Sequence, residues 1–218
     1  MNIKIFIVLI AALLSACDTK NKIKTETVVY NSNVREAIGQ YEKELVRQRN
    51  EIVFENGAKA KNCDSYIKAS MASRIGEGVN NQIIKGDYLV CDVLLLLGHA
   101  TYISPKSKPE FGKILAQQVD LRSFPSSHVQ MLDDKKHTLV KLSDKLNIGA
   151  TTVNIDSNDW FYGFELVATT DVNKNGKADW IIWFVDEAKT GNYRGYQTLV
   201  AYDVDKNKGL IKLQPFPN

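Results

Sequence analysis

The chain has 218 residues, of which 44% are hydrophobic, so it is long enough to bury one substantial core. Its 28 Lys and Arg residues against 25 Asp and Glu residues give a formal net charge of +3, and these charges are scattered along the sequence. This pattern does not indicate nucleic-acid binding, although it permits weak attraction to anionic lipid headgroups.

The first sixteen residues have the pattern of a secretion signal. Lys4 lies in a short polar start, residues 5–14 are apolar, and the small residues Ser15 and Ala16 precede Cys17. Such a stretch is too short to cross a bilayer comfortably and suits removal by a signal peptidase. An ordinary cleaved signal with a cysteine nearby is the alternative interpretation.

The run Leu14-Ser15-Ala16-Cys17 resembles the lipobox of bacterial lipoproteins. The resemblance implies that residues 1–16 are removed and that the Cys17 thiol is acylated. It therefore implies a lipid-anchored protein of the bacterial cell envelope that faces the periplasm. Several acyl chains make such an anchor effectively permanent. Asp18 resembles the inner-membrane retention signal of enteric lipoproteins, so the inner membrane is slightly favoured over the outer one. Residues 17–30 predict a flexible, lysine-rich tether.

Apolar residues recur at three- and four-residue steps between Asn31 and Asn56. This spacing predicts one amphipathic helix that is capped by Ser32 or Asn33 and ends near Gly57. We expect its apolar stripe to pack in the core, since a stripe at this spacing is more often core than a partner-binding face.

Two further helices are predicted over residues 62–75 and 79–100. The second contains the run 89–97, which is apolar on nearly every side except at Asp92, and this predicts a buried central helix. A buried strand is the alternative for this run. A short helix is predicted over 110–121, and residues 129–146 fit either a helix or a strand.

After Gly149, β-branched and aromatic residues become dense and turn residues recur at short intervals. Strands are predicted over 151–155, 161–170, 180–185, 197–203 and 210–213, with turns at 173–176 and 206–209. Helices followed by strands predict an α+β fold, in which a helical N-terminal part (31–148) packs on a C-terminal antiparallel β-sheet (149–218). We expect residues 31–218 to form one domain.

Cys63 and Cys91 are the two cysteines that remain beside Cys17. In an oxidising envelope compartment, the simplest prediction is that these two cysteines form a disulfide, which would stabilise the fold by roughly 3 kcal/mol. The alternative is that Cys91 is a small core residue and Cys63 a surface thiol.

Residues 171–179 place oxygen-bearing side chains at alternate positions around a glycine. The run resembles the calcium loops of EF-hands, dockerins and integrin-type repeats, although Ile182 stands where an EF-hand has its bidentate glutamate. The resemblance implies a weak, structural calcium site, and the alternative is a plain Asn-Gly turn. Its implied ligands are the side chains of Asp171, Asn173, Asn175 and Asp179 and the carbonyl of Lys177.

Aromatic residues and an arginine are dense near the predicted hairpin that follows. Such side chains anchor many interfaces, because they bury a large area and still form hydrogen bonds. The candidate interface residues are Trp183, Tyr193, Arg194 and Tyr196. The alternative is that they fill the sheet and its hairpin.

Evidence for an enzyme is weak in the sequence. His99, His128 and His137 are the only histidines, and they lie in no metal-ligand or catalytic motif. Ser127 precedes His128, but adjacency in sequence does not make a catalytic pair. Asp186 and Glu187 are adjacent on a predicted strand and should face opposite sides of it.

These features favour a non-catalytic envelope lipoprotein that binds a macromolecule. We expect this partner to be a protein, which the lipoprotein would bind either as an assembly component or as an immunity-type protein that neutralises a toxin. A periplasmic hydrolase that uses His128 or His99 is the alternative.

Overall fold

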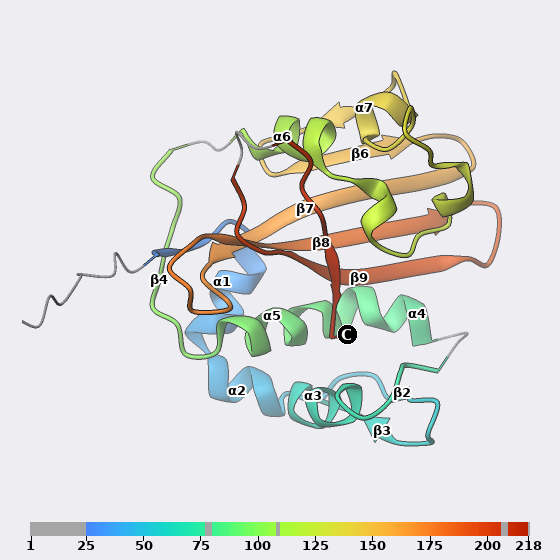
Figure 1. Ribbon diagram of the computed structural model, residues 1–218. Helices are drawn as coiled ribbons and strands as arrows, with labels where there is room; N and C mark the ends of the chain where they lie inside the picture. Colours follow the sequence, from blue (N-terminus) through green and yellow to red (C-terminus); the bar gives the residue numbers. More distant parts are fainter. Residues whose placement is uncertain (1–24, 77–79, 108–109, 206–208, 218) are drawn as a thin grey trace, which may run out of the picture.

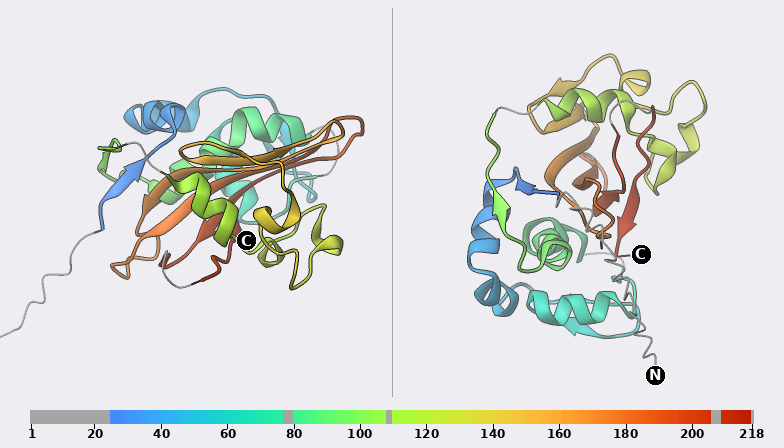
Figure 2. Two further views of the ribbon diagram at one scale, coloured as in Figure 1. Left: turned by 90° about the horizontal axis from the view of Figure 1, so that it is seen from above. Right: turned by 60° about the vertical axis from the view of Figure 1, so that its left-hand side comes forward.

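The computed structural model describes residues 25–76, 80–107, 110–205 and 209–217. Within these residues, a mixed eight-stranded sheet lies between two groups of helices (Figures 1 and 2). The α+β fold predicted from the sequence is therefore confirmed. The predictions about residues 1–24, among them Cys17 and Asp18, lie outside the described residues.

The sheet is built around two long neighbouring strands, β7 and β8. Its order is β10-β9-β8-β7-β1-β4, and β6 also pairs with β7 and with β5. The pairings among β5 to β10 are antiparallel, as predicted, whereas β1 pairs in parallel with β4. The strands are β1 (Thr27–Val29), β4 (Tyr102–Ile103), β5 (Asn147–Ile148), β6 (Thr152–Asp156), β7 (Trp160–Thr170), β8 (Asp179–Ala188), β9 (Arg194–Ala201) and β10 (Gln214–Phe216).

Helices cover both faces of the sheet (Figure 2). One face carries α1 (Ser32–Gly39), α4 (Asn80–Ile83), the π-helix η1 (Ile84–Tyr88) and α5 (Leu89–Leu97). A further layer on α5 consists of α2 (Tyr41–Val46), α3 (Cys63–Ser70) and the small hairpin of β2 (Ile52–Val53) and β3 (Lys59–Ala60). The other face carries α6 (Phe111–Gln118), the 3-10 turns η2 (Leu121–Ser123) and η3 (Val129–Met131), and α7 (Leu139–Leu142).

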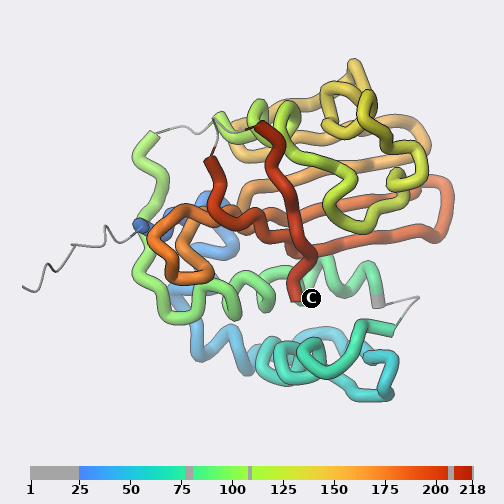
Figure 3. The backbone as a smooth tube through the Cα atoms, in the orientation of Figure 1, coloured from blue at the N-terminus to red at the C-terminus, as the bar shows by residue number. Residues whose placement is uncertain are grey.

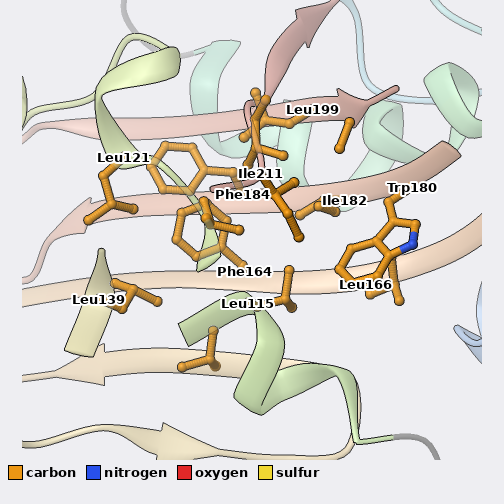
Figure 4. Close-up of a cluster of buried hydrophobic side chains, with 14 of the residues drawn as sticks. Leu115, Leu121, Leu139, Phe164, Leu166, Trp180, Ile182, Phe184, Leu199 and Ile211 are labelled. Atoms are coloured by element: carbon orange, nitrogen blue, oxygen red, sulfur yellow. The ribbon is translucent and has the colours of Figure 1, made fainter. Parts of the chain in front are cut away.

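The alternation of side chains along β8 divides the core in two. Trp180, Ile182 and Phe184 point toward α6 and form the larger cluster with Leu115 (Figure 4). Ile181 points the other way, into a cluster shared with α1 and α5. Both faces of the strand are buried, because each face packs against helices.

The folded part begins earlier than the sequence predicts. Thr27–Val29 forms strand β1, Val29 is fully buried, and β1 pairs with both β4 and β7. Residues 27–29 therefore belong to the sheet rather than to the predicted tether.

The single helix predicted over 31–56 is wrong. Asn31 is the cap, because its side chain accepts a hydrogen bond from the backbone N–H of Val34, and the helix is interrupted at Gln40. Helix α2 ends at Val46, and residues 52–53 pair with 59–60 as a hairpin. An apolar residue buried in a short strand fits the same spacing as one on a helix, so the pattern did not separate them.

The strand predicted over 210–213 is also misplaced. Ile211 makes one isolated bridge with Val119, and pairing with β9 begins only at Gln214. Residues 129–146, which fitted either element, hold only the two short helical segments η3 and α7.

The apolar run 89–97 forms the buried helix α5, which excludes the alternative of a strand. Cys91, Val93 and Leu94 are fully buried in it. Cys91 forms a disulfide with Cys63 on α3, so the predicted pairing is confirmed.

Asp92 joins helix α5 to its neighbours on two sides. Its carboxylate accepts hydrogen bonds from the hydroxyls of Tyr66 on α3 (2.9 Å) and Thr198 on β9 (2.7 Å). Burial raises the pKa of Asp92 to about 7, although both hydrogen bonds act in the opposite direction. The helical layer and the sheet thus meet at a buried acid whose protonated form is favoured more than it would be in water.

We expect the substitution Asp92→Asn to change how stability depends on pH. Because the pKa is raised in the folded state, Asp92 favours folding most below pH 4, and this contribution is lost as the pH rises toward and through 7. Relative to the wild type, D92N should gain about 3 kcal/mol of stability between pH 5 and pH 8.5, because about two pH units of this window lie below the folded-state pKa of Asp92. Denaturant unfolding of both proteins at the two pH values measures this difference, and parallel pH profiles would contradict it.

Candidate functional site

A buried carboxylate organises the end of the sheet where β7 begins and β8 ends. Asp186 on β8 is fully buried and accepts hydrogen bonds from the Ser127 backbone N–H (2.7 Å), the Ser127 hydroxyl (2.7 Å), the Trp160 indole N–H (2.7 Å) and the Tyr193 hydroxyl (3.3 Å). These donors come from three separate segments of the chain. A buried anion is tolerated when several donors surround it, so Asp186 ties the three segments together.

Four aromatic rings lie around this carboxylate, and we call them the aromatic cluster: His128, Trp160, Tyr162 and Tyr193. The rings of Trp160 and Tyr193 are stacked with centroids 5.7 Å apart, and the His128 ring meets Trp160 and Tyr162 edge-on. Tyr193 is 44% exposed, and neither Trp160 nor His128 is fully buried. The cluster therefore exposes part of its aromatic surface, and the hydrogen bonds to the buried Asp186 fix the orientations of the Trp160 and Tyr193 rings.

The surroundings of Asp186 shift the titration of neighbouring groups. Burial raises the pKa of Tyr193 to about 12, and the charge of Asp186 and the hydrogen bond to it act in the same direction. Burial lowers the pKa of His128, while Asp186 partly opposes this shift. At neutral pH, Tyr193 is accordingly a neutral hydrogen-bond donor and His128 a predominantly neutral ring.

The structure brings together the residue types of a serine hydrolase, but in a different order. The Ser127 hydroxyl lies 2.7 Å from Asp186 and 2.9 Å from Nδ1 of His128. In a catalytic triad the histidine lies between the serine and the carboxylate and removes the serine proton. Here the serine lies in the middle, and the carboxylate would repel the alkoxide. This geometry suits a structural hydrogen bond better than a nucleophile.

The aromatic cluster lies at the opposite end of β7 from strand β1, because Trp160 begins β7 and β1 pairs with Ala168 and Thr169 near its end. In Figure 3 the blue start of the described chain lies at one end of the sheet and the turn between β8 and β9 at the other. Trp160 begins the eleven-residue strand β7, and the loop after Thr170 lies at the other end, where the Thr25 hydroxyl donates to the Gly176 carbonyl (3.0 Å). A strand of this length spans roughly 35 Å. The start of the described chain and the cluster are separated by that length.

The four candidate interface residues are not brought together on one surface. Tyr193 belongs to the aromatic cluster, whereas Trp183 and Tyr196 lie on the opposite face of the sheet, packed against helical residues. The Tyr196 hydroxyl donates to Glu187, and Lys85 lies over its ring.

Arg194 lies in the hairpin between β8 and β9. Its guanidinium donates to the backbone carbonyls of Ala188, Gly191 and Tyr193 and so closes this hairpin. As predicted, Asp186 and Glu187 face opposite sides of the sheet.

The predicted calcium loop is closed by its own hydrogen bonds. The Asp171 carboxylate accepts from the backbone N–H groups of Asn175 and Gly176, and the Asn175 side-chain oxygen accepts from the backbone N–H of Lys177. Asp179 is fully buried and accepts three backbone N–H groups. Gly176 has a φ of +91°, the left-handed turn expected of glycine at this position.

Further polar contacts of this loop involve a neighbouring turn. The Asp203 carboxylate pairs with the Lys177 ammonium (2.7 Å) and accepts from the side-chain amides of Asn173 and Asn175. Across the residues that the structure describes, no group of three or more His, Cys, Asp or Glu side chains is arranged to hold a metal ion. Calcium binding by this loop stays a prediction.

The contacts of the two remaining histidines involve other residues than Asp186. The His99 ring lies at a tilt against Tyr41, and Nε2 lies 3.5 Å from the exposed Glu42, so His99 is a surface residue rather than the core histidine that its position after the apolar run favoured. His137 is buried, with Nε2 at 3.1 Å from the Lys141 ammonium. Neither contact joins a hydroxyl or thiol to the histidine.

Comparison with models of protein families, with curated proteins and with solved structures finds no match to this chain. Among the described helices, none has the length and apolar character of a membrane span.

The substitution Asp186→Asn should destabilise the protein by about 2–4 kcal/mol, because an amide offers one acceptor oxygen to four donors and turns its own NH₂ toward them. Denaturant unfolding measures the loss. Asp156→Asn is the matched control, since Asp156 lies at the same end of the sheet in an exposed ion pair with Lys189 and should cost less than about 1 kcal/mol. Equal effects of the two substitutions would show that Asp186 has no special structural role.

Proposed function

We propose that this protein is a lipid-anchored, non-catalytic component of the bacterial cell envelope that binds a protein partner through the aromatic cluster. The observation that carries the proposal is the stacked pair of the exposed Tyr193 and the partly exposed Trp160, whose polar groups both donate to the buried carboxylate of Asp186. The anchor is Cys17, as the lipobox resemblance implies.

The cluster has the properties that make a residue an anchor of an interface. Trp and Tyr contribute large contact areas, and rings that are already fixed lose little conformational entropy on binding. Two apolar side chains in the adjacent turn η3 enlarge the exposed surface, since Val129 is 46% and Met131 58% exposed. A protein partner that buries this surface would gain apolar contact without leaving the indole N–H or the tyrosine hydroxyl unpaired.

The position of the cluster fits a protein that is anchored at its N-terminus. Cys17 precedes Thr25 by eight residues, which reach at most roughly 28 Å, and Thr25 contacts the loop at the end of the sheet that is remote from the cluster. With Cys17 in a membrane, the remote end of the sheet would face the lipid and the aromatic cluster would face the periplasm. An envelope assembly component and an incoming toxin are the two partner classes expected from the sequence. Either one could contact a cluster that faces the periplasm.

A hydrolase that uses Ser127 and His128 is the second candidate, favoured by the 2.9 Å contact between the two side chains. The central position of Ser127 and its bond to Asp186 argue against it. Hydrolysis that is lost in Ser127→Ala would establish the hydrolase.

The anchor is tested on the protein isolated from its own bacterium. Mass spectrometry should find residue 17 as the first residue, carrying two or three acyl chains, and Cys17→Ala should release the protein from the membrane fraction. An unmodified thiol at Cys17, or an uncut leader, would contradict the anchor without bearing on the aromatic cluster.

Partner binding is tested by photo-crosslinking in cells of the same bacterium. A photoreactive amino acid in place of Val129, beside the cluster, should form one dominant protein adduct. Trp160→Ala should remove that adduct, and the affinity of the identified partner should fall by at least about thirtyfold, as expected of an anchor residue.

Tyr202→Ala is the control for this experiment, because Tyr202 is also an exposed aromatic residue (38%) but follows β9 at the remote end of the sheet. It should leave the adduct and the affinity unchanged. An adduct that persists in Trp160→Ala, while the variant keeps its fold, would show that the cluster does not bind the partner.

A further inference from the structure

A groove lies beside β9 near the edge of the sheet, mostly on the face that is turned away from Asp186, although Pro125 and Gln197 from the other face also line it. Its volume is about 800 Å³, and it is bounded by the end of α3 and the residues after it, by η1 and α5, by β9, and by residues 215–217. The side chains of Ile84, Leu89, Tyr196 and Phe216 give it apolar and aromatic walls. A concave apolar site with a few convergent polar groups is the usual form of a small-molecule site.

The polar groups of this groove meet at Asp92. Tyr66 and Thr198, which donate to its two carboxylate oxygens, also line the groove. Both donors are neutral hydroxyls, and no salt bridge to Asp92 occurs among the described residues. Arg74, the one cationic residue in the described lining, is itself exposed and makes no ion pair with Asp92. The buried carboxylate therefore has hydrogen bonds but no compensating positive charge.

This arrangement differs from that of Asp186, which has four donors around it. The Asp92 carboxylate has two donors, and burial raises its pKa, as expected of an anion whose desolvation is incompletely compensated. Each of its oxygens can accept another hydrogen bond. A cation entering the groove would supply both the missing charge and further donors.

We propose that the groove binds an amphipathic amine, whose ammonium group pairs with Asp92 and whose hydrocarbon part lies against Leu89, Tyr196 and Phe216. Charge complementarity selects the amine over a neutral or anionic ligand of the same length, and the apolar walls select an amine with a hydrocarbon body over a small, fully polar one. This site is independent of the partner-binding surface, because Asp92 and Asp186 lie on opposite faces of the sheet.

The probes that test this site are n-hexylamine, 1-hexanol and hexanoate, titrated into the folded protein at pH 8.5 and followed by NMR. At this pH Asp92 is ionised and the alkylamine is protonated. Hexylamine should bind at least tenfold more tightly than hexanol and should shift the signals of Thr198 and Tyr66. Equal affinities for the amine and the alcohol, or tighter binding of hexanoate, would overturn the proposal.

Two variants assign the effect to Asp92. Asp92→Asn should weaken hexylamine binding at least tenfold, to the level of hexanol, while leaving hexanol binding unchanged. Asp87→Asn is the matched control, because Asp87 is an acidic residue in the adjacent π-helix that contacts Asn50 and does not line the groove. Hexylamine binding to D87N should equal that of the wild type, and a loss in both variants would overturn the assignment.

A measurement on the wild type does not depend on whether D92N folds. The pKa of Asp92, followed through its side-chain carboxyl ¹³C signal, should fall by at least one unit when hexylamine is present in excess, since the bound cation favours the carboxylate. An unchanged pKa at saturating amine would overturn the proposal.

Discussion

The end of the sheet that carries the aromatic cluster depends on one buried anion. Asp186 is fully enclosed, and water cannot compensate its charge, so the fold must bring donors to it. The donors are two groups of Ser127, the indole of Trp160 and the hydroxyl of Tyr193. The carboxylate thereby fixes a loop, a strand start and a hairpin relative to one another.

Two of the buried aspartates, Asp186 and Asp92, differ in how their carboxylates are compensated. Asp186 accepts four hydrogen bonds, and two of its donors, the Trp160 indole and the Tyr193 hydroxyl, belong to the stacked pair of rings, whose positions are thereby fixed. Asp92 accepts only two hydroxyl groups, and its raised pKa leaves it close to equally protonated and ionised near neutral pH. The Asp186 carboxylate has four hydrogen-bond donors and lies beneath the aromatic cluster. The Asp92 carboxylate has two donors and lines a groove.

Much of the fold could be predicted because its signals are local. The apolar run 89–97 is too uniformly hydrophobic to lie anywhere but inside, and the spacing of β-branched and aromatic residues after Gly149 predicted most of the C-terminal strands. The pairing of Cys63 with Cys91 followed from the compartment and from the count of cysteines. The helix predicted over 31–56 failed because Ile52, which is buried in a hairpin strand, fits helical spacing as well as strand pairing.

The candidate site could not be predicted, because its contacts join distant parts of the chain. Ser127 and Asp186 are 59 residues apart, and Trp160 and Asp186 are 26 apart, so no linear motif contains them. One local signal was available. Asp186 has the same strand parity as Ile182 and Phe184, so alternation places an acid on a buried face, where it must find donors. The candidate interface residues were chosen by residue type, and only Tyr193 lies in the cluster.

The most direct test of the role of Asp186 is the exchange of the Trp160 indole proton with solvent, measured by ¹⁵N-edited NMR. The protein has three tryptophans, and Trp160→Phe assigns the signal. If a buried carboxylate holds the indole, its N–H should resonate at an unusually low field and exchange at least a hundredfold more slowly than a free indole. An exchange rate close to that of a free indole would show that the ring is not held by Asp186, and the proposed ordering of the surface would be wrong.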